Sequence, residues 1–391
     1  MSASPVDEGL LRQVADTLEQ HRHTVVGLSH AIAADPELAH EEHRAMDRCA
    51  GVLEQAGIEV ERGAYGLPTA FAARFGSGDT HVVLCAEYDA LPEVGHACGH
   101  NVIAAAAVGA GLVLAPLAEA AGLRVTVLGT PAEERFGGKV DLLDAGAFDD
   151  ADAALMVHPT PYDEYGPRSL GIEEWQVVYT GRASHASAAP EQGRNALDGL
   201  VAGYQAVAML RQHLRPQQQV HGIITHGGDA PNVVPERTEG LFYLRARTPD
   251  DLADLRERVR ACLQGAATAT GTSVEITPVG HTYLPLRPHA GLVGAFTDAC
   301  AALGRPYTPD PQGDGLGGST DFGNVSQRLP GLHAYVAVHS WPAVNHQHEF
   351  AAHCVTPQAD ETLLQSAGAL ALTALAVAGD PGVLHDPDPT S

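Results

Sequence analysis

The middle of the chain, residues 171–286, carries the pattern that most restricts the fold. A half-exposed strand (IEEWQVVYTG) is followed by a helix at 195–214, two further strands, a second helix and a last strand (TSVEITPVG). The order β-α-β-β-α-β is typical of a ferredoxin-like domain. Because sequence of a different pattern lies on both sides, we expect residues 171–286 to form an inserted α+β domain.

The flanking segments, residues 1–170 and 287–391, alternate short apolar strands with helices. Apolar runs at 81–85, 124–128 and 153–157 are separated by helical stretches, which is typical of a mainly parallel sheet covered by helices on both faces. With 391 residues, the chain also exceeds the ~250–300 residues at which single hydrophobic cores stop growing. We therefore predict one α/β domain, built from both flanking segments and interrupted by the insertion.

The net charge narrows the range of partners. The chain has 23 Lys and Arg residues against 48 Asp and Glu residues, a formal net charge of −25. Such a surface repels phosphate backbones and anionic lipid headgroups, so we expect neither nucleic acid nor a membrane as a partner. The six cysteines include no Cys-x-x-Cys pair, which fits a reducing compartment. We see no signal-peptide pattern and no run of about 18 apolar residues, and we expect a cytoplasmic protein.

Four segments place polar residues just beyond an apolar strand, at the sheet edge where open α/β folds bind ligands. They are AEYDALPEVGHACGHN (86–101), GTPAEERFGG (129–138), MVHPT (156–160) and VNHQHEF (344–350).

The first segment holds a thiol and an imidazole two residues apart, Cys98 and His100. On a turn that leads into a helix, both can reach one cation, and Gly99 allows the close approach. His96 is a further candidate ligand just upstream. Alternatively, Cys98 is a small buried hydrophobic residue and His100 a helix-capping residue.

The other segments supply carboxylates and imidazoles. Glu133 and Glu134 are adjacent, and in extended backbone their side chains point in opposite directions, so one can bind metal while the other faces the substrate water. A negatively charged first turn of a helix explains the pair equally well. His158 ends a strand, where a hydrogen-bonded structural histidine is the common alternative. The spacing alone does not say which of three further histidines matters: His346, His348 and His353.

Taken together, one Cys, three His and one Glu form a ligand set for two borderline-soft divalent cations. A second carboxylate beside them supplies the base that hydrolysis by a metal-activated water needs. No GxSxG, Walker A or GxGxxG motif competes with this interpretation.

At this point the chain resembles the M20 metallopeptidases, closest to the amidohydrolase branch that includes N-acyl-amino-acid hydrolases and aminobenzoyl-glutamate hydrolase. The motifs HACGHN, PAEE, GRASHAS, GGSTDFGN and NHQHEF appear in the expected order over nearly the whole chain. The resemblance implies two divalent metal ions (Zn, Mn, Co or Ni) and five ligands, with Cys98 bridging the two ions: Cys98, His100, Glu134, His158 and His346.

The resemblance also assigns the residues around the ligands. Glu133 would be the general base that takes a proton from the metal-bound water and passes it to the leaving amine. Asp89 would orient a ligand from behind. Other branches have a metal-binding His two residues before that Asp, whereas this chain has Glu87, whose role is left open.

The inserted domain would be the lid and dimerisation module of a homodimer. His185 matches a histidine that stabilises the oxyanion in the partner subunit's site. Asn232 and either Arg245 or Arg247 match the region that holds a substrate carboxylate or backbone carbonyl. A loop has backbone N–H groups that can contact the substrate carboxylate: Gly317, Gly318, Ser319 and Thr320. Salt bridges at a strand edge explain the arginines as well, and ordinary turn chemistry explains the glycines.

We therefore expect a metal-dependent amidohydrolase that cleaves an N-acyl amino acid or a dipeptide-like substrate. Two alternatives are a thiol hydrolase that uses Cys98 with His100, and a catalytically silent metal-binding protein on the same fold.

Overall fold

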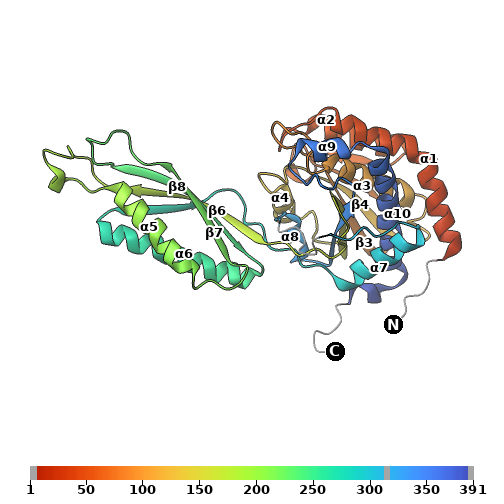
Figure 1. Cartoon of the computed structure of the whole chain (residues 1–391). Coiled ribbons are helices and arrows are strands. Elements are labelled where there is room, and N and C mark those ends of the chain that lie inside the picture. The colour runs from red at the N-terminus through yellow and green to blue at the C-terminus, as the bar shows by residue number, and fades with distance from the viewer. Residues whose placement is uncertain (1–6, 312–317, 386–391) are drawn as a thin grey trace. The chain divides into compact units, whose positions relative to one another are not determined.

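The computed structural model describes residues 7–311 and 318–385 (Figure 1). The described residues divide into two compact units. The first unit comprises residues 7–168, 286–311 and 321–385, and the second comprises 169–285 and 318–320. Residues 318–320 pack with the second unit, whereas the sequence pattern assigns them to the flanking α/β domain. The reason is local: Ser319 Oγ donates to the Leu170 carbonyl at 2.6 Å, and Leu170 N donates to the Gly318 carbonyl at 3.1 Å.

The first unit is built on a six-stranded sheet of order β1-β2-β4-β3-β5-β10. Four neighbouring strands, β4, β3, β5 and β10, run parallel, and β2 and β1 add an antiparallel edge. The strands are β1 (Val60–Arg62), β2 (Phe71–Phe75), β3 (Thr80–Glu87), β4 (Leu123–Thr130), β5 (Ala153–Thr160) and β10 (Gly331–Ala337). The sequence patterns did not predict the antiparallel edge.

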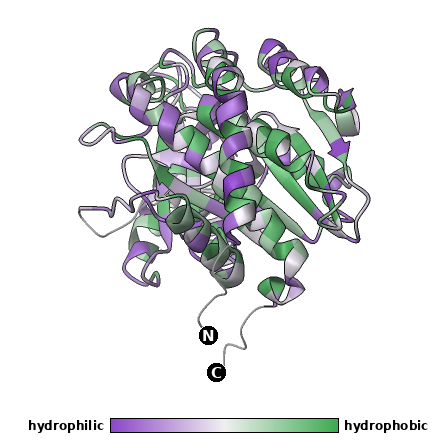
Figure 2. Ribbon diagram, turned by 90° about the vertical axis from the view of Figure 1, so that its right-hand side faces the viewer, coloured by the Kyte–Doolittle hydropathy of each residue, from purple (hydrophilic) through white to green (hydrophobic). Residues whose placement is uncertain are grey.

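Helices cover both faces of this sheet. Along β3, Val82, Leu84 and Ala86 belong to one apolar cluster while Val83 and Cys85 belong to another, as the alternation of side chains in a strand requires. In the hydropathy colouring, the helices toward the viewer show both hydrophilic and hydrophobic residues (Figure 2). The helices are α1 (Glu8–Ala33), α2 (His43–Gln55), α3 (His100–Leu114), α4 (Gly138–Asp144), α7 (Ala290–Ala302), α8 (Phe322–Ser326), α9 (His348–His353) and α10 (Pro357–Gly379).

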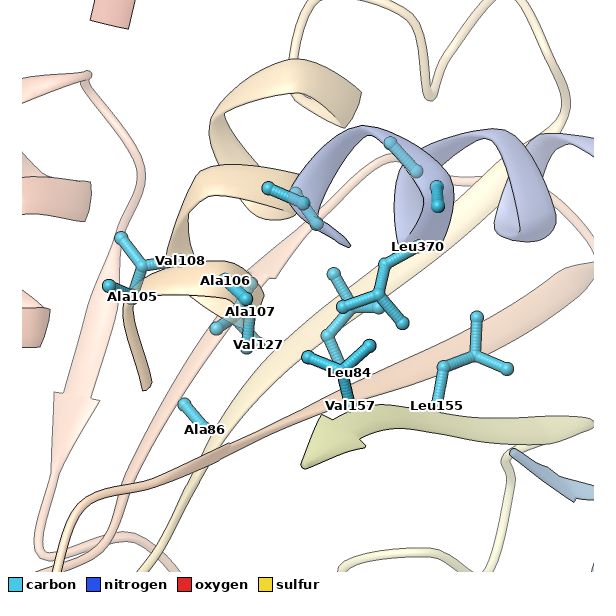
Figure 3. Packing of buried hydrophobic residues seen from close by; sticks show 14 of the residues in the cluster. Leu84, Ala86, Ala105, Ala106, Ala107, Val108, Val127, Leu155, Val157 and Leu370 are labelled. Atoms are coloured by element: carbon cyan, nitrogen blue, oxygen red, sulfur yellow. The ribbon is translucent and has the colours of Figure 1, made fainter. Parts of the chain in front are cut away.

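Helix α3 is buried along its whole length, and small residues let it approach the sheet. A Cβ added at Gly111 would lie 2.6 Å from Val127 Cγ2. Side chains of α3, α10 and strands β3, β4 and β5 meet in this layer (Figure 3). Among the described residues, α10 is long and apolar enough to cross a membrane by length and composition, but 78% of its most apolar window is buried inside the protein. That burial is what a core helix requires.

The second unit has the element order β6-α5-β7-β8-α6-β9 and an antiparallel sheet of order β7-β8-β6-β9. Its apolar core lies between the sheet and the two helices and includes Trp175, Tyr179 and Phe242. Its elements are β6 (Gly171–Thr180), α5 (Ala196–Arg211), β7 (Gln219–His226), β8 (Arg237–Ala246), α6 (Pro249–Thr270) and β9 (Ser273–Pro278). The predicted fold class, a mainly parallel α/β domain with an inserted ferredoxin-like α+β domain, is confirmed.

Candidate metal centre

The parallel strands bring the four polar segments to one edge of the sheet. The first segment follows β3, the second follows β4, the third is the end of β5, and the fourth follows β10. Because β4, β3, β5 and β10 are neighbours and run in the same direction, their carboxyl ends meet there.

The turn between Cys98 and His100 depends on glycine. Gly99 has φ 75°, and a Cβ at this position would lie 2.7 Å from Pro159 Cβ and 3.1 Å from Cys354 Sγ. Only glycine adopts this left-handed conformation without strain in so narrow a space. The turn leads from the loop after β3 to the first residue of α3, so Cys98 and His100 are buried and close together.

Metal-binding side chains of the described residues gather in three groups at this edge. Within each group, one potential ligand atom of every residue lies within 4.8 Å of the others. The groups are Cys98, His100 and His158; Cys98, Glu134 and His346; and Glu87, His100 and Glu133. The first two share Cys98 and contain all five residues that the family resemblance names as ligands.

Hydrogen bonds orient two of the imidazoles. His100 Nδ1 lies 2.8 Å from the Asp89 carbonyl and 3.0 Å from Asp89 Oδ1, and His158 Nδ1 lies 2.9 Å from the Pro159 carbonyl. Each Nδ1 must donate, because these partners only accept, so in the neutral ring Nε2 keeps a free lone pair. Asp89 Oδ2 also accepts from Glu134 N at 3.0 Å, so one carboxylate holds two segments of the edge.

The two adjacent glutamates fall in different donor groups, but the extended backbone that the sequence predicted for them is not observed. They lie in a turn, after Ala132 with φ 63°, rather than in extended backbone. Glu133 falls in the group with Glu87 and His100, and Glu134 in the group with Cys98 and His346. They do not begin a helix either, since α4 starts at Gly138.

Burial and closely spaced carboxylates shift the pKa values of three groups at this edge. Burial, together with the charges of Glu87 and Glu134, raises the pKa of Glu133 well above its ordinary value. Burial and Glu134 likewise raise the pKa of the Cys98 thiol. Burial lowers the pKa of His100, but the carboxylates of Glu87 and Asp89 outweigh it and raise that pKa overall. The shifts of Glu133 and Cys98 follow first from burial and then from neighbouring carboxylates, and the shift of His100 follows from the carboxylates against the effect of burial.

Several candidate ligand atoms at this edge have no hydrogen-bond partner among the residues that the structure describes. Within the described part of the chain, Glu87 Oε1, His100 Nε2 and Glu134 Oε1 are buried and make no hydrogen bond. Buried polar atoms are normally paired, so such a set requires an additional partner. Thiolate, imidazole and carboxylate donors suit zinc and its neighbours in the first transition series. The residues therefore fit divalent cations.

The remaining histidines of these segments differ in their relation to the three groups. His346, with φ 71°, is exposed and belongs to the second group, with its Nε2 4.0 Å from Glu134 Oε2. His348 and His353 begin and end α9 and join none of the groups found among the described residues. His96 is buried, and burial lowers its pKa to about 3, but it too stays outside these groups.

The sequence patterns missed a buried ion-pair network behind the site. Lys139, the only lysine of the chain, is fully buried; its ammonium contacts Glu87 and lies 2.8 Å from Asp321 Oδ1. They also missed His333, whose buried ring stacks on that of His158 at 5.5 Å. A single lysine just after a glycine pair and a histidine inside an apolar strand were the available signals.

His185 and Asn232 lie together in the second unit. Ala186 N donates to the Asn232 carbonyl at 3.0 Å. The backbones of His185 and Val233 pair in an isolated antiparallel β-bridge. His185 Nδ1 accepts from Ser187 N and Ala188 N, so a neutral ring carries its proton on Nε2.

Arg245 lies at the other end of the same sheet. It is near the end of β8, whereas Asn232 precedes the start of that strand at Arg237; ten residues of strand span roughly 30 Å. Arg245 Nη1 donates to Ser319 Oγ at 3.0 Å. Thr320, the residue after Ser319, is buried. Arg247 is exposed, and Gly317 lies outside the described residues. Arg245 and His185 of one chain therefore cannot contact the same small substrate.

Glu42 makes the stability of this edge depend on pH. Its buried carboxylate accepts from Ala132 N at 2.9 Å, and burial, with the charge of Asp89, raises its pKa from 4.5 to about 7. A folded-state pKa above the unfolded one adds stability that is present below about pH 4.5 and is lost as the pH rises through 7. We expect Glu42→Gln to raise the free energy of unfolding at pH 8, by up to about 3 kcal/mol, and to change it little at pH 4.5.

Thermal unfolding of metal-free protein at the two pH values measures this difference. Glu41→Gln, at the exposed neighbouring position, is the matched control and should show no pH-dependent change. An equal gain for Glu42→Gln at both pH values would show that the carboxyl group is not the cause.

Comparison with protein families agrees with this site. Residues 83–375 match the family described as Peptidase family M20/M25/M40. The chain is 39% identical to mouse Xaa-Arg dipeptidase, over 97% of this chain and 91% of that protein. It is 33% identical to a p-aminobenzoyl-glutamate hydrolase chain of Escherichia coli, over 76% of this chain and 66% of that protein.

A solved structure has the same fold. The chain superposes on a dinuclear metal binding peptidase from the M20 family of Bacillus subtilis with a TM-score of 0.74 and 20% identity, over 92% of this chain and 99% of that one.

Proposed function

The chain belongs to peptidase family M20, and on that premise we propose that it is a metallopeptidase that hydrolyses the amide bond of a dipeptide or an N-acyl amino acid with two divalent cations. One observation carries the proposal: two donor groups share Cys98, and Glu133 lies beside them. In this arrangement Cys98, His100 and His158 would hold one cation, and Cys98, Glu134 and His346 would hold a second. The relative from Bacillus subtilis, described as a dinuclear metal binding peptidase, supports the number of ions.

The cations would supply Lewis-acid chemistry, polarising the scissile carbonyl and lowering the pKa of water. Asp89 fixes the ring of His100 and the backbone of Glu134. Glu133 Oε would take the proton of the attacking water and return it to the nitrogen of the leaving amine, as a general acid–base must. Burial raises the pKa of Glu133 above its ordinary value, which helps this carboxylate to hold a proton that it takes up.

The substrate side follows from residues of the second unit. We assign Arg245, with Ser319 and the backbone at 318–320, to the carboxylate of the amino-acid product, since a guanidinium is the usual partner of a carboxylate. His185, with its proton on Nε2, is assigned to the oxyanion in the site of a partner subunit, with Asn232 beside it. The separation of His185 from Arg245 within one chain supports this homodimeric arrangement, in which the second unit is the lid and dimerisation module.

We propose dipeptides with a C-terminal basic residue as the first substrates to test, because of the relatives described as Xaa-Arg dipeptidases in mouse and human. p-Aminobenzoyl-glutamate and N-acyl amino acids complete the set. The experiment is a screen of these compounds against metal-loaded protein, reading the release of the amine.

Removal of metal tests the central claim. A strong chelator is expected to abolish turnover, because the base Glu133 then has neither a polarised carbonyl nor an acidified water to work with. Addition of Zn, Mn, Co or Ni should restore it. Elemental analysis must show that the treated protein is metal-free, and full activity in that protein would refute the proposal.

A further inference from the structure

Glu87 lies at the end of β3, between the candidate metal centre and Lys139. Its side chain is completely buried. Oε2 contacts the ammonium of Lys139, whereas Oε1 is 3.1 Å from His100 Nε2. Within the described residues Oε1 makes no hydrogen bond. One oxygen of this carboxylate is therefore held from behind, and the other faces the nitrogen that we assign to a cation.

Lys139 fixes this orientation. Its ammonium lies 2.8 Å from Asp321 Oδ1, and its backbone N–H donates to Asp321 Oδ2 at 2.9 Å. Asp321 thus holds both ends of the lysine, and the lysine in turn holds Glu87. All three side chains are buried, so the cost of moving any charged group away from its partners is high.

The distance between Glu87 and His100 fits two ligands of one ion. Zinc ligands lie about 2.0–2.2 Å from the ion, so two of them at tetrahedral or octahedral angles are roughly 3.0–3.5 Å apart. The observed 3.1 Å lies in this range.

An ion pair with a protonated His100 fits the distance as well, but within the described residues it leaves both Oε1 and Nε2 without a hydrogen bond. Nδ1 of His100 is already the donor to Asp89. Nε2 is therefore the ring nitrogen left to face a cation in the group with Cys98 and His158. Once Nε2 holds a cation it has no hydrogen for Glu87, and Oε1 is left facing the ion.

We propose that Glu87 is a further ligand of the cation held by Cys98, His100 and His158, and that Lys139 is the positioning residue that presents it. The inference rests on the proposed metal centre. It gives this cation a second anionic ligand beside the shared thiolate, so that each of the two cations has one carboxylate: Glu87 for one and Glu134 for the other.

Zinc titration of the full-length protein against a chromophoric chelator tests the role of Glu87. Wild-type protein should bind two Zn²⁺ per chain. Glu87→Gln keeps an acceptor for Lys139 but removes the anionic ligand. We expect one Zn²⁺ to bind as in the wild type and the other to bind at least about tenfold more weakly. Glu42→Gln, the same change at another buried carboxylate outside the three groups, should bind both ions like the wild type.

Because Lys139 is the only lysine, protein grown with ¹³Cε-labelled lysine gives a single lysine signal in NMR. In wild-type protein this signal should shift when zinc binds, since Glu87 links the ammonium to the ion. In Glu87→Gln the shift should require the higher zinc concentration of the weakened site. If Glu87→Gln does not fold, Glu87→Asp keeps the charge but is too short to reach both partners, and it should show the same weakened site.

The outcomes separate the two proposals. Wild-type protein that binds none of Zn, Mn, Co and Ni would overturn the proposed function itself. The role of Glu87 alone would be overturned if Glu87→Gln or Glu87→Asp bound two zinc ions with unchanged affinity. The same would hold if the lysine signal of wild-type protein did not shift when zinc is added.

Discussion

Replacement of Glu133 by glutamine is expected to lower kcat by about 10²–10⁴-fold, the usual contribution of a general base, while the protein keeps both metal ions. Glutamine has nearly the same shape and cannot accept the proton of the attacking water. Glu133 is 7% exposed, and its carboxylate lies in the group with Glu87 and His100, so the substitution leaves the packing of the turn unchanged.

Steady-state kinetics and elemental analysis of the same preparation check this prediction. Glu134→Gln, the neighbouring position, is the matched comparison: it should lose metal as well as turnover, because we assign Glu134 as a ligand. If Glu133→Gln lost a metal ion, Glu133 would be a ligand and not the base. An unchanged kcat would show that Glu133 is not the general base.

Replacement of Cys98 by serine is expected to weaken the binding of both cations and to abolish turnover at ordinary metal concentrations. Cys98 is the only residue that the first two donor groups share, so its loss should weaken the binding of both cations. Each other ligand of these two groups belongs to only one of them, so its loss should weaken the binding of one cation. A serine hydroxyl is a far weaker ligand than a thiolate for a borderline-soft cation. We expect purified Cys98→Ser to contain less than one metal ion per chain.

Cys354→Ser is the control for this variant. Cys354 is buried next to Gly99 and belongs to none of the three groups, so it should retain metal and activity. An inactive Cys98→Ser protein with full metal content would instead favour a thiol hydrolase. Burial raises the pKa of the Cys98 thiol in the absence of a cation, which opposes that mechanism, because the thiolate is the nucleophile. Metal binding without turnover in wild-type protein would favour a silent metal-binding protein.

Much of the fold followed from local patterns. The buried strands 81–85, 124–128 and 153–157 and the β-α-β-β-α-β insertion have periodicities that depend only on which residues lie close in the chain. The antiparallel edge formed by β1 and β2 was not predicted, because Val60–Arg62 is three residues long and partly exposed and short strands carry little periodic signal. The premise for Glu133 and Glu134 failed because a left-handed Ala132 replaces extended backbone.

The sequence by itself determined the chemical types of the donors, their order along the chain and their positions after apolar strands. Only the tertiary structure decided how they converge. His346, which the family resemblance already names, groups with Cys98 and Glu134, and Glu87, whose role was left open, faces His100. The physical reason is that convergence depends on strand order and on buried charge. Four parallel strands bring their carboxyl ends together. Lys139 is distant in sequence from Glu87 and Asp321, and folding buries all three and pairs the lysine with both carboxylates.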